Sequence, residues 1–158
     1  MSIFEALIRL AFPDETRPLA SDCSDVAIYQ RIGIHIFPYF GEEETVYVAE
    51  LTDGAVRQAI RSLDWEQGFH QVIVVREPGV SMETSGSLLP NHGLSVIHED
   101  RTTNATLMAR EVPETIPELE AIQLAFIKGG DAWRSVREFY AIKRRRTPEP
   151  FPLTKDAP

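Results

Sequence analysis

Residues 71–99, QVIVVREPGVSMETSGSLLPNHGLSVIHE, decide the fold, because strand-type runs and turn sequences alternate in them without a helical interruption. Residues 72–75 form a β-branched run that is too short for a free-standing helix. The run is followed by Glu77-Pro78-Gly79, where a residue with fixed φ precedes one that is free to take positive φ. Two further runs follow, separated by a second turn sequence, Pro90-Asn91-His92-Gly93. The stretch therefore predicts three sequential strands in an antiparallel meander.

Two amphipathic helices are predicted, one on each side of the meander along the chain. The first covers residues 53–63 behind the capping pair Thr52-Asp53, with apolar side chains at i, i+3, i+4 and i+7. The second covers residues 116–128, begins with the capping-box spacing Thr115-Ile116-Pro117-Glu118 and ends at Gly129-Gly130. Both apolar stripes need a shared surface. We therefore predict an α+β fold in which an antiparallel sheet of about five or six strands carries the helices mainly on one face.

The other segments carry shorter patterns. Alternating or β-branched runs predict strands at residues 26–29, 32–37, 45–51 and 105–110. A helix is predicted to begin near Ser2, and a short one to follow Asp131, carrying Trp133, Val136 and Tyr140.

The length of 158 residues suits one domain, which we assign to residues 1–142. Residues 143–158 form a basic and then Pro-rich tail with too little apolar area to order itself. No apolar run approaches the roughly 20 residues of a membrane span, and the N-terminus lacks the features of a signal peptide. The single cysteine, Cys23, excludes an internal disulfide and suits a reducing compartment. We expect a cytoplasmic protein without membrane contact.

Charge is distributed unevenly along the chain. The net charge is −8, and without residues 143–158 the chain holds 11 basic and 22 acidic side chains, a net charge of −11. An acidic body disfavours nucleic acid and favours rapid association with a basic protein. The alternative interpretation is that the charge serves solubility alone.

Three histidines are the candidates for chemistry. His92 and His98, with the adjacent carboxylates, match no established metal-site spacing, and a metal needs three or four converging ligands, so we predict neither a metal nor a cofactor. His70 follows two carboxylates, Asp64 and Glu66, on one predicted loop. One hypothesis is therefore a small enzyme or ligand-binding domain that uses His70, His92 and His98. Another is an adaptor whose Pro-rich tail is a peptide ligand.

The meander and the closing segment also show a resemblance. Gly86-Ser87-Leu88, Pro90 and Gly93-Leu94-Ser95-Val96, together with the capped helix, the Gly-Gly stop and Trp133, resemble the pattern of small bacterial immunity proteins that accompany secreted polymorphic toxins. The resemblance implies a cytoplasmic α+β domain that neutralises a cognate toxin by binding, without catalysis. The acidic body agrees with it, because nuclease toxins are often basic and complementary charge raises association rates.

Five acidic residues are the predicted partner-binding set: Glu42, Glu43, Glu44, Glu99 and Asp100. They fall at connections between predicted strands, and loops on a rigid sheet commonly carry recognition residues. Whether the two groups adjoin depends on the strand order, which the sequence leaves open.

Overall fold

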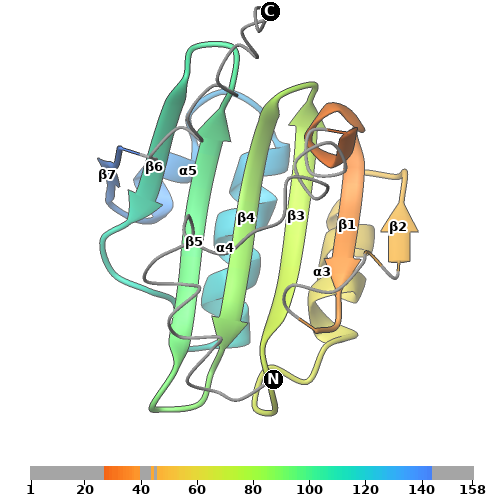
Figure 1. The fold of residues 1–158 in the computed structure, drawn as a ribbon, viewed down its shortest axis with the longest axis vertical. Coiled ribbons are helices and arrows are strands. Elements are labelled where there is room, and N and C mark those ends of the chain that lie inside the picture. The colour runs from red at the N-terminus through yellow and green to blue at the C-terminus, as the bar shows by residue number, and fades with distance from the viewer. Residues whose placement is uncertain (1–26, 40–43, 45, 144–158) are drawn as a thin grey trace, which may run out of the picture.

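The computed structural model describes residues 27–39, 44 and 46–143. In this part of the chain seven strands form one open antiparallel sheet with the order β2-β1-β3-β4-β5-β6-β7 (Figure 1). The strands are β1 Gly33–Phe37, β2 Val46–Val48, β3 His70–Glu77, β4 Val80–Ser87, β5 Gly93–Asp100, β6 Ala105–Ala109 and β7 Phe139–Ala141. The helices are α3 Asp53–Arg61, α4 Ile116–Ile127 and α5 Trp133–Val136. The predicted α+β fold is confirmed.

The predicted meander forms the centre of the sheet as β3, β4 and β5. Gly79 takes a φ of 80° in the β3–β4 turn. Gly86 lies where β4 meets β5, and its φ is 121°. A Cβ at this position would lie 2.3 Å from the carbonyl oxygen of Gly93, so the two strands approach too closely there for any side chain.

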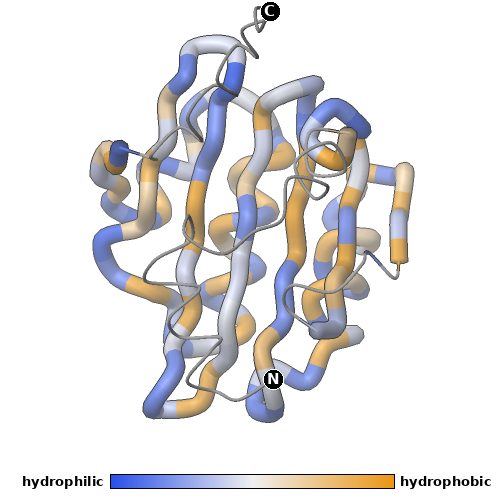
Figure 2. The backbone as a smooth tube through the Cα atoms, viewed as in Figure 1, coloured by the Kyte–Doolittle hydropathy of each residue, from blue (hydrophilic) through white to orange (hydrophobic). Residues whose placement is uncertain are grey.

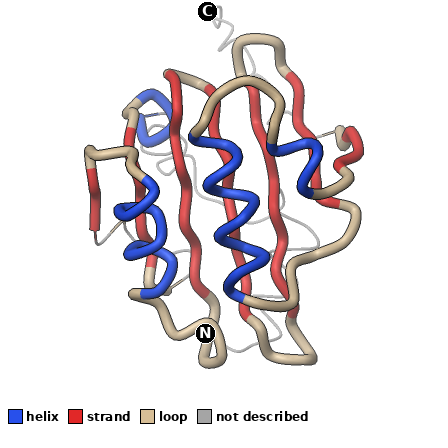
Figure 3. Tube along the Cα trace, turned by 180° about the vertical axis from the view of Figure 1, so that it is seen from behind, coloured by secondary structure: helices blue, strands red, loops and turns tan. Residues whose placement is uncertain are grey.

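The main core lies between the sheet and helices α3, α4 and α5, which cover one face (Figure 3). The middle of β3 is apolar, as Figure 2 shows, and its Val72 and Val74 are buried in this core. Both predicted caps form. The Thr52 hydroxyl accepts a hydrogen bond from the N–H of Ala55, and Thr115 begins α4 with a complete capping box.

The other face of the sheet is also buried along its central strands. Paired residues of neighbouring strands share a face, so His35, Ile73 and Glu83 lie side by side across β1, β3 and β4. All three are buried, and Ile73 belongs to a second core cluster with Tyr29 and residues of β1 and β3.

Two predictions about elements are wrong. Residues 27–30 are helical rather than part of a strand. The predicted last helix ends after α5, and Tyr140 lies in β7, where it pairs with Met108 of β6. Pairing with a distant strand overrides the local pattern here, and it adds a strand beyond the five or six expected. The predicted helix near Ser2, Cys23 and the tail from 144 onward lie outside the described residues.

No helix in the described ranges is long and apolar enough to cross a membrane.

Candidate functional site

His70 connects two loops at one end of the sheet. Its Nδ1 bonds the carbonyl oxygen of Pro38, and its Nε2 lies 2.6 Å from that of Asp64 and 2.7 Å from that of Gln67. All three partners are backbone carbonyl oxygens, so the ring donates to those that its N–H faces, and it lies between the β1–β2 connection and the α3–β3 loop. It contacts neither the Asp64 nor the Glu66 carboxylate through these bonds, so the predicted acid and base on one loop do not form a pair here.

His92 and His98 lie far apart. His92 sits in the β4–β5 turn, where its ring contacts Phe69 and its Nδ1 bonds the hydroxyl of buried Ser87 at 3.1 Å. His98 lies six residues further on, about 20 Å along β5 at roughly 3.3 Å per residue. His70 begins β3 at the same end of the sheet as His92. The structure therefore does not bring the three histidines into one site.

His98 is enclosed by aromatic rings. Its ring stacks on Trp133 with centroids 4.3 Å apart and meets the edge of Phe126 at 5.8 Å. Burial, helped by the positive charge of Arg134, lowers the pKa of His98 to about 4. Its Nδ1 is buried and has no hydrogen-bond partner among the described residues. The neutral ring therefore acts as a packing element of the core.

Metal-ligating side chains do not converge in the part of the chain that the structure describes, where no group of three or more His, Cys, Asp or Glu is placed to hold an ion.

Three of the five acidic residues predicted to bind a partner are described, and each has a role inside the fold. Glu44 lies 2.9 Å from Nδ1 of the fully buried His35. Glu99 is half-buried and pairs with a neighbouring arginine at 3.4 Å. Asp100 accepts hydrogen bonds in the β5–β6 turn, chiefly from the Thr102 hydroxyl, and these bonds lower its pKa. These side chains stabilise the fold.

These acidic residues also do not share an edge. The antiparallel order makes β1 end at one end of the sheet and β5 at the other. Glu44 bonds to β1, whereas Glu99 belongs to β5, with β3 and β4 between them. Three strand spacings of about 4.8 Å separate β1 from β5. Glu42 and Glu43 lie outside the described residues.

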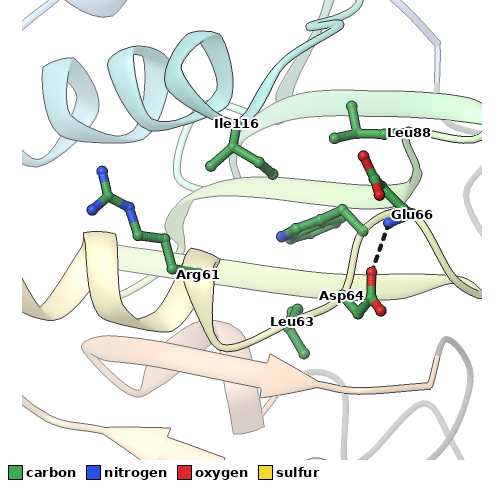
Figure 4. A pocket seen from close by; sticks show the side chains of 7 residues that line it. Arg61, Leu63, Asp64, Glu66, Leu88 and Ile116 are labelled. Carbon is green, nitrogen blue, oxygen red and sulfur yellow. Dashed lines mark hydrogen bonds between the residues drawn. The ribbon is translucent and has the colours of Figure 1, made fainter.

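A pocket lies at the same end of the sheet as His70. This strand-end pocket has a volume of about 230 Å³ and lies between the end of α3, the loop after it, the β4–β5 turn and the start of α4 (Figure 4). Its lining residues are Arg61, Leu63, Asp64, Trp65, Glu66, Leu88 and Ile116.

The loop that forms one wall of the strand-end pocket is held rigidly. The Trp65 indole N–H donates to the Ile60 carbonyl at 2.8 Å, and the Leu88 N–H donates to the Trp65 carbonyl at 2.7 Å. Trp65 is 2% exposed, so its indole closes the edge of the core. Together with the contacts of His70, these bonds hold the loop backbone in one conformation.

Two carboxylates stand on one side of the strand-end pocket. Asp64 accepts a hydrogen bond from the N–H of Glu66 at 3.2 Å, and Arg61 lies on the opposite side (Figure 4). The Asp64 and Glu66 residues are both exposed. The pocket therefore has an apolar middle, formed by Leu63, Leu88 and Ile116, and charged residues around it.

Sequence reasoning missed two buried carboxylates. Glu120 of α4 is 3% exposed and is held by Arg57 at 3.2 Å and by Arg61 at 2.6 Å. Hydrogen bonding to Glu120 raises the pKa of Arg61 above its usual value. On the other face, Glu83 accepts hydrogen bonds from Tyr29, at 2.9 Å, and from two neighbours on β3 and β4. In the sequence both look like ordinary surface carboxylates.

Comparison of the chain with protein-family models, curated proteins and solved structures gave no match.

Proposed function

We propose that this protein is a non-catalytic immunity protein that neutralises a basic protein toxin by binding it at the strand-end pocket. The observation that carries the proposal is a loop fixed by His70 and Trp65 that presents Asp64 and Glu66 beside an apolar pocket. A lysine or arginine side chain of a partner fits this arrangement, with its apolar stem over Leu88 and its charge at the carboxylates.

The resemblance to immunity proteins supports the same location. Its two segments, residues 86–96 and 115–133, are distant in sequence, yet Leu88 from the first and Ile116 from the second both line the strand-end pocket. The acidic charge of the chain adds long-range attraction for a basic partner, which raises the association rate more than it raises affinity.

The proposal is tested by capturing the product of the neighbouring gene and measuring its binding kinetics. The variant Asp64→Asn with Glu66→Lys should lower the association rate constant about tenfold at low salt and less at high salt. The matched control, Asp131→Asn with Glu77→Lys, makes the same charge change at the other end of the sheet and should have a much smaller effect.

Two results would count against the proposal in different ways. Equal association rates for the two double variants across a salt series would remove the strand-end pocket as the docking site. Failure to capture any toxin-like neighbour would count against the immunity function itself.

A further inference from the structure

A second surface lies on the outer side of the helices, where α4 runs between α3 and α5 (Figure 3). A groove of about 460 Å³ follows α4 there. We call it the helix-face groove, and the residues that line it include Arg57, Glu120, Ala121, Ala125, Lys128 and Val136.

The outward side of α4 is unusually apolar for a surface helix. Ala121 is exposed, Ala125 is half-buried, and Val136 of the neighbouring α5 is 41% exposed. Surface helices normally place charged and polar side chains on the side away from the core. Here α4 presents small apolar side chains at i and i+4, so a partner backbone can approach closely.

The rim of the helix-face groove is cationic. The carboxylate of Glu120 is buried and bound by Arg57 and Arg61, whose side chains remain 46% and 62% exposed. Lys128 is exposed at the far end of α4, without an ion-pair partner among the residues that the structure describes. The groove lining therefore holds two cations, Arg57 and Lys128, and one carboxylate, Glu120, which is buried, in a chain that has 24 acidic and 16 basic side chains.

We infer that the helix-face groove binds an amphipathic helix of a partner protein, with leucine-like side chains over Ala121 and Ala125 and carboxylates beside them. Apolar anchors at helical spacing fit an apolar groove between helices. Carboxylates on the flanks of that helix would meet Arg57 and Lys128, opposite in sign to the rest of the protein. This surface and its acidic partner are separate from the proposed toxin contact, which uses Asp64 and Glu66.

The full chain is titrated into a fluorescent helical peptide of about 15 residues with leucines at i, i+3, i+4 and i+7 and glutamates beside them. A second peptide carries lysines in place of the glutamates. The glutamate peptide should bind about tenfold more tightly by fluorescence anisotropy. Ala121→Glu, which adds bulk and a like charge in the groove, should weaken its binding about tenfold.

The matched control is Gln58→Glu, which makes the same charge change at an exposed position of α3 that does not line the groove. It should bind the glutamate peptide as the wild type does, and all variants should melt at similar temperatures. Equal binding of the two peptides, or of the wild type and Ala121→Glu, would overturn the inference. Sedimentation velocity gives a further check. If the wild type is a dimer and Ala121→Glu is a monomer, the groove holds a second copy of this chain, and the inference is overturned.

Discussion

Protonation of His98, whose ring stacks on Trp133 in the core, makes the stability of the protein depend on pH. Its folded-state pKa of about 4 lies below the ordinary value of 6.5, so the unfolded chain binds a proton more readily than the folded one. Stability from the neutral ring is therefore complete above pH 6.5 and is lost as the pH falls toward 4. Burial is the largest cause of the lowered pKa. The charges of Arg134 and Arg76 lower the pKa further, and those of Asp100 and Asp131 raise it.

His98→Phe should remove this pH dependence. Phenylalanine keeps the contact with Trp133 and does not titrate, whereas wild-type His98 should lose about 2 kcal/mol of unfolding free energy between pH 7 and pH 5. Urea denaturation of both proteins at the two pH values measures the difference. The carboxylates titrate in both proteins, so their contribution to the pH dependence cancels when the proteins are compared. Identical losses for the wild type and His98→Phe would show that folding does not lower the pKa of the ring.

Residue environments were the hardest feature to predict from the sequence. Glu120 occupies a helix position that looks exposed, and its burial depends on Arg61, 59 residues earlier in the chain. His70 looks like a general base on a loop, yet its partners are carbonyl groups that the fold brings together. Such contacts depend on which elements adjoin, and local patterns do not contain that information.

At the scale of elements, the capping box fixes where α4 begins. The Thr115 hydroxyl accepts from the N–H of Glu118, and the Glu118 carboxylate accepts from the N–H groups of Glu114 and Thr115. These bonds, with the Glu114 N–H as the largest cause, lower the pKa of Glu118. Ile116 of the strand-end pocket lies inside this cap, so the cap also positions the pocket wall.

Thr115→Ala should therefore destabilise the protein by about 1 kcal/mol, because one N–H at the helix start loses its partner. The neighbouring change Glu114→Ala is the control, since only the backbone N–H of Glu114 takes part in the cap. Thermal unfolding followed by circular dichroism compares the two. A larger loss for Glu114→Ala than for Thr115→Ala would contradict the assigned role of the cap.

The two long helices could be predicted because their signals are local. Caps and apolar spacing occur within each segment, and α3 and α4 begin where these signals place them. The two wrong predictions arise where contacts with distant segments decide the structure. Residues 27–30 contain Ile28 and Tyr29, which favour strands by propensity, and β7 becomes a strand only because β6 is available to pair with it.

At the scale of the whole molecule, strand order decides where charged turns come together. The sequence left open whether the two groups of predicted acidic residues adjoin, and the antiparallel order places the ends of β1 and β5 at opposite ends of the sheet (Figure 1). The sequence identified the correct fold class and most strands without determining their order. The strand-end pocket and the helix-face groove could not have been foreseen, because each forms where several elements meet.

The central strands also suggest an order of events during folding. Strands β3 to β6 are consecutive in sequence and joined by short turns, so their pairing closes only small loops. β1 must instead find β3 across the whole of β2 and α3, and β7 must find β6 across α4 and α5. Since longer loops cost more entropy to close, the meander should be formed in the transition state before either flank.

Stopped-flow measurements on two buried valines can test this order. Val96→Ala in the meander should mainly slow refolding, and Val56→Ala in α3 should mainly speed unfolding, although both remove the same two methyl groups from the core. If Val56→Ala mainly slows refolding and Val96→Ala mainly speeds unfolding, α3 forms before the meander and the proposed order is wrong. If the meander does form first, a chain emerging from the ribosome can build its central hairpins before α4 has been synthesised, and both proposed binding surfaces are completed only at the last step.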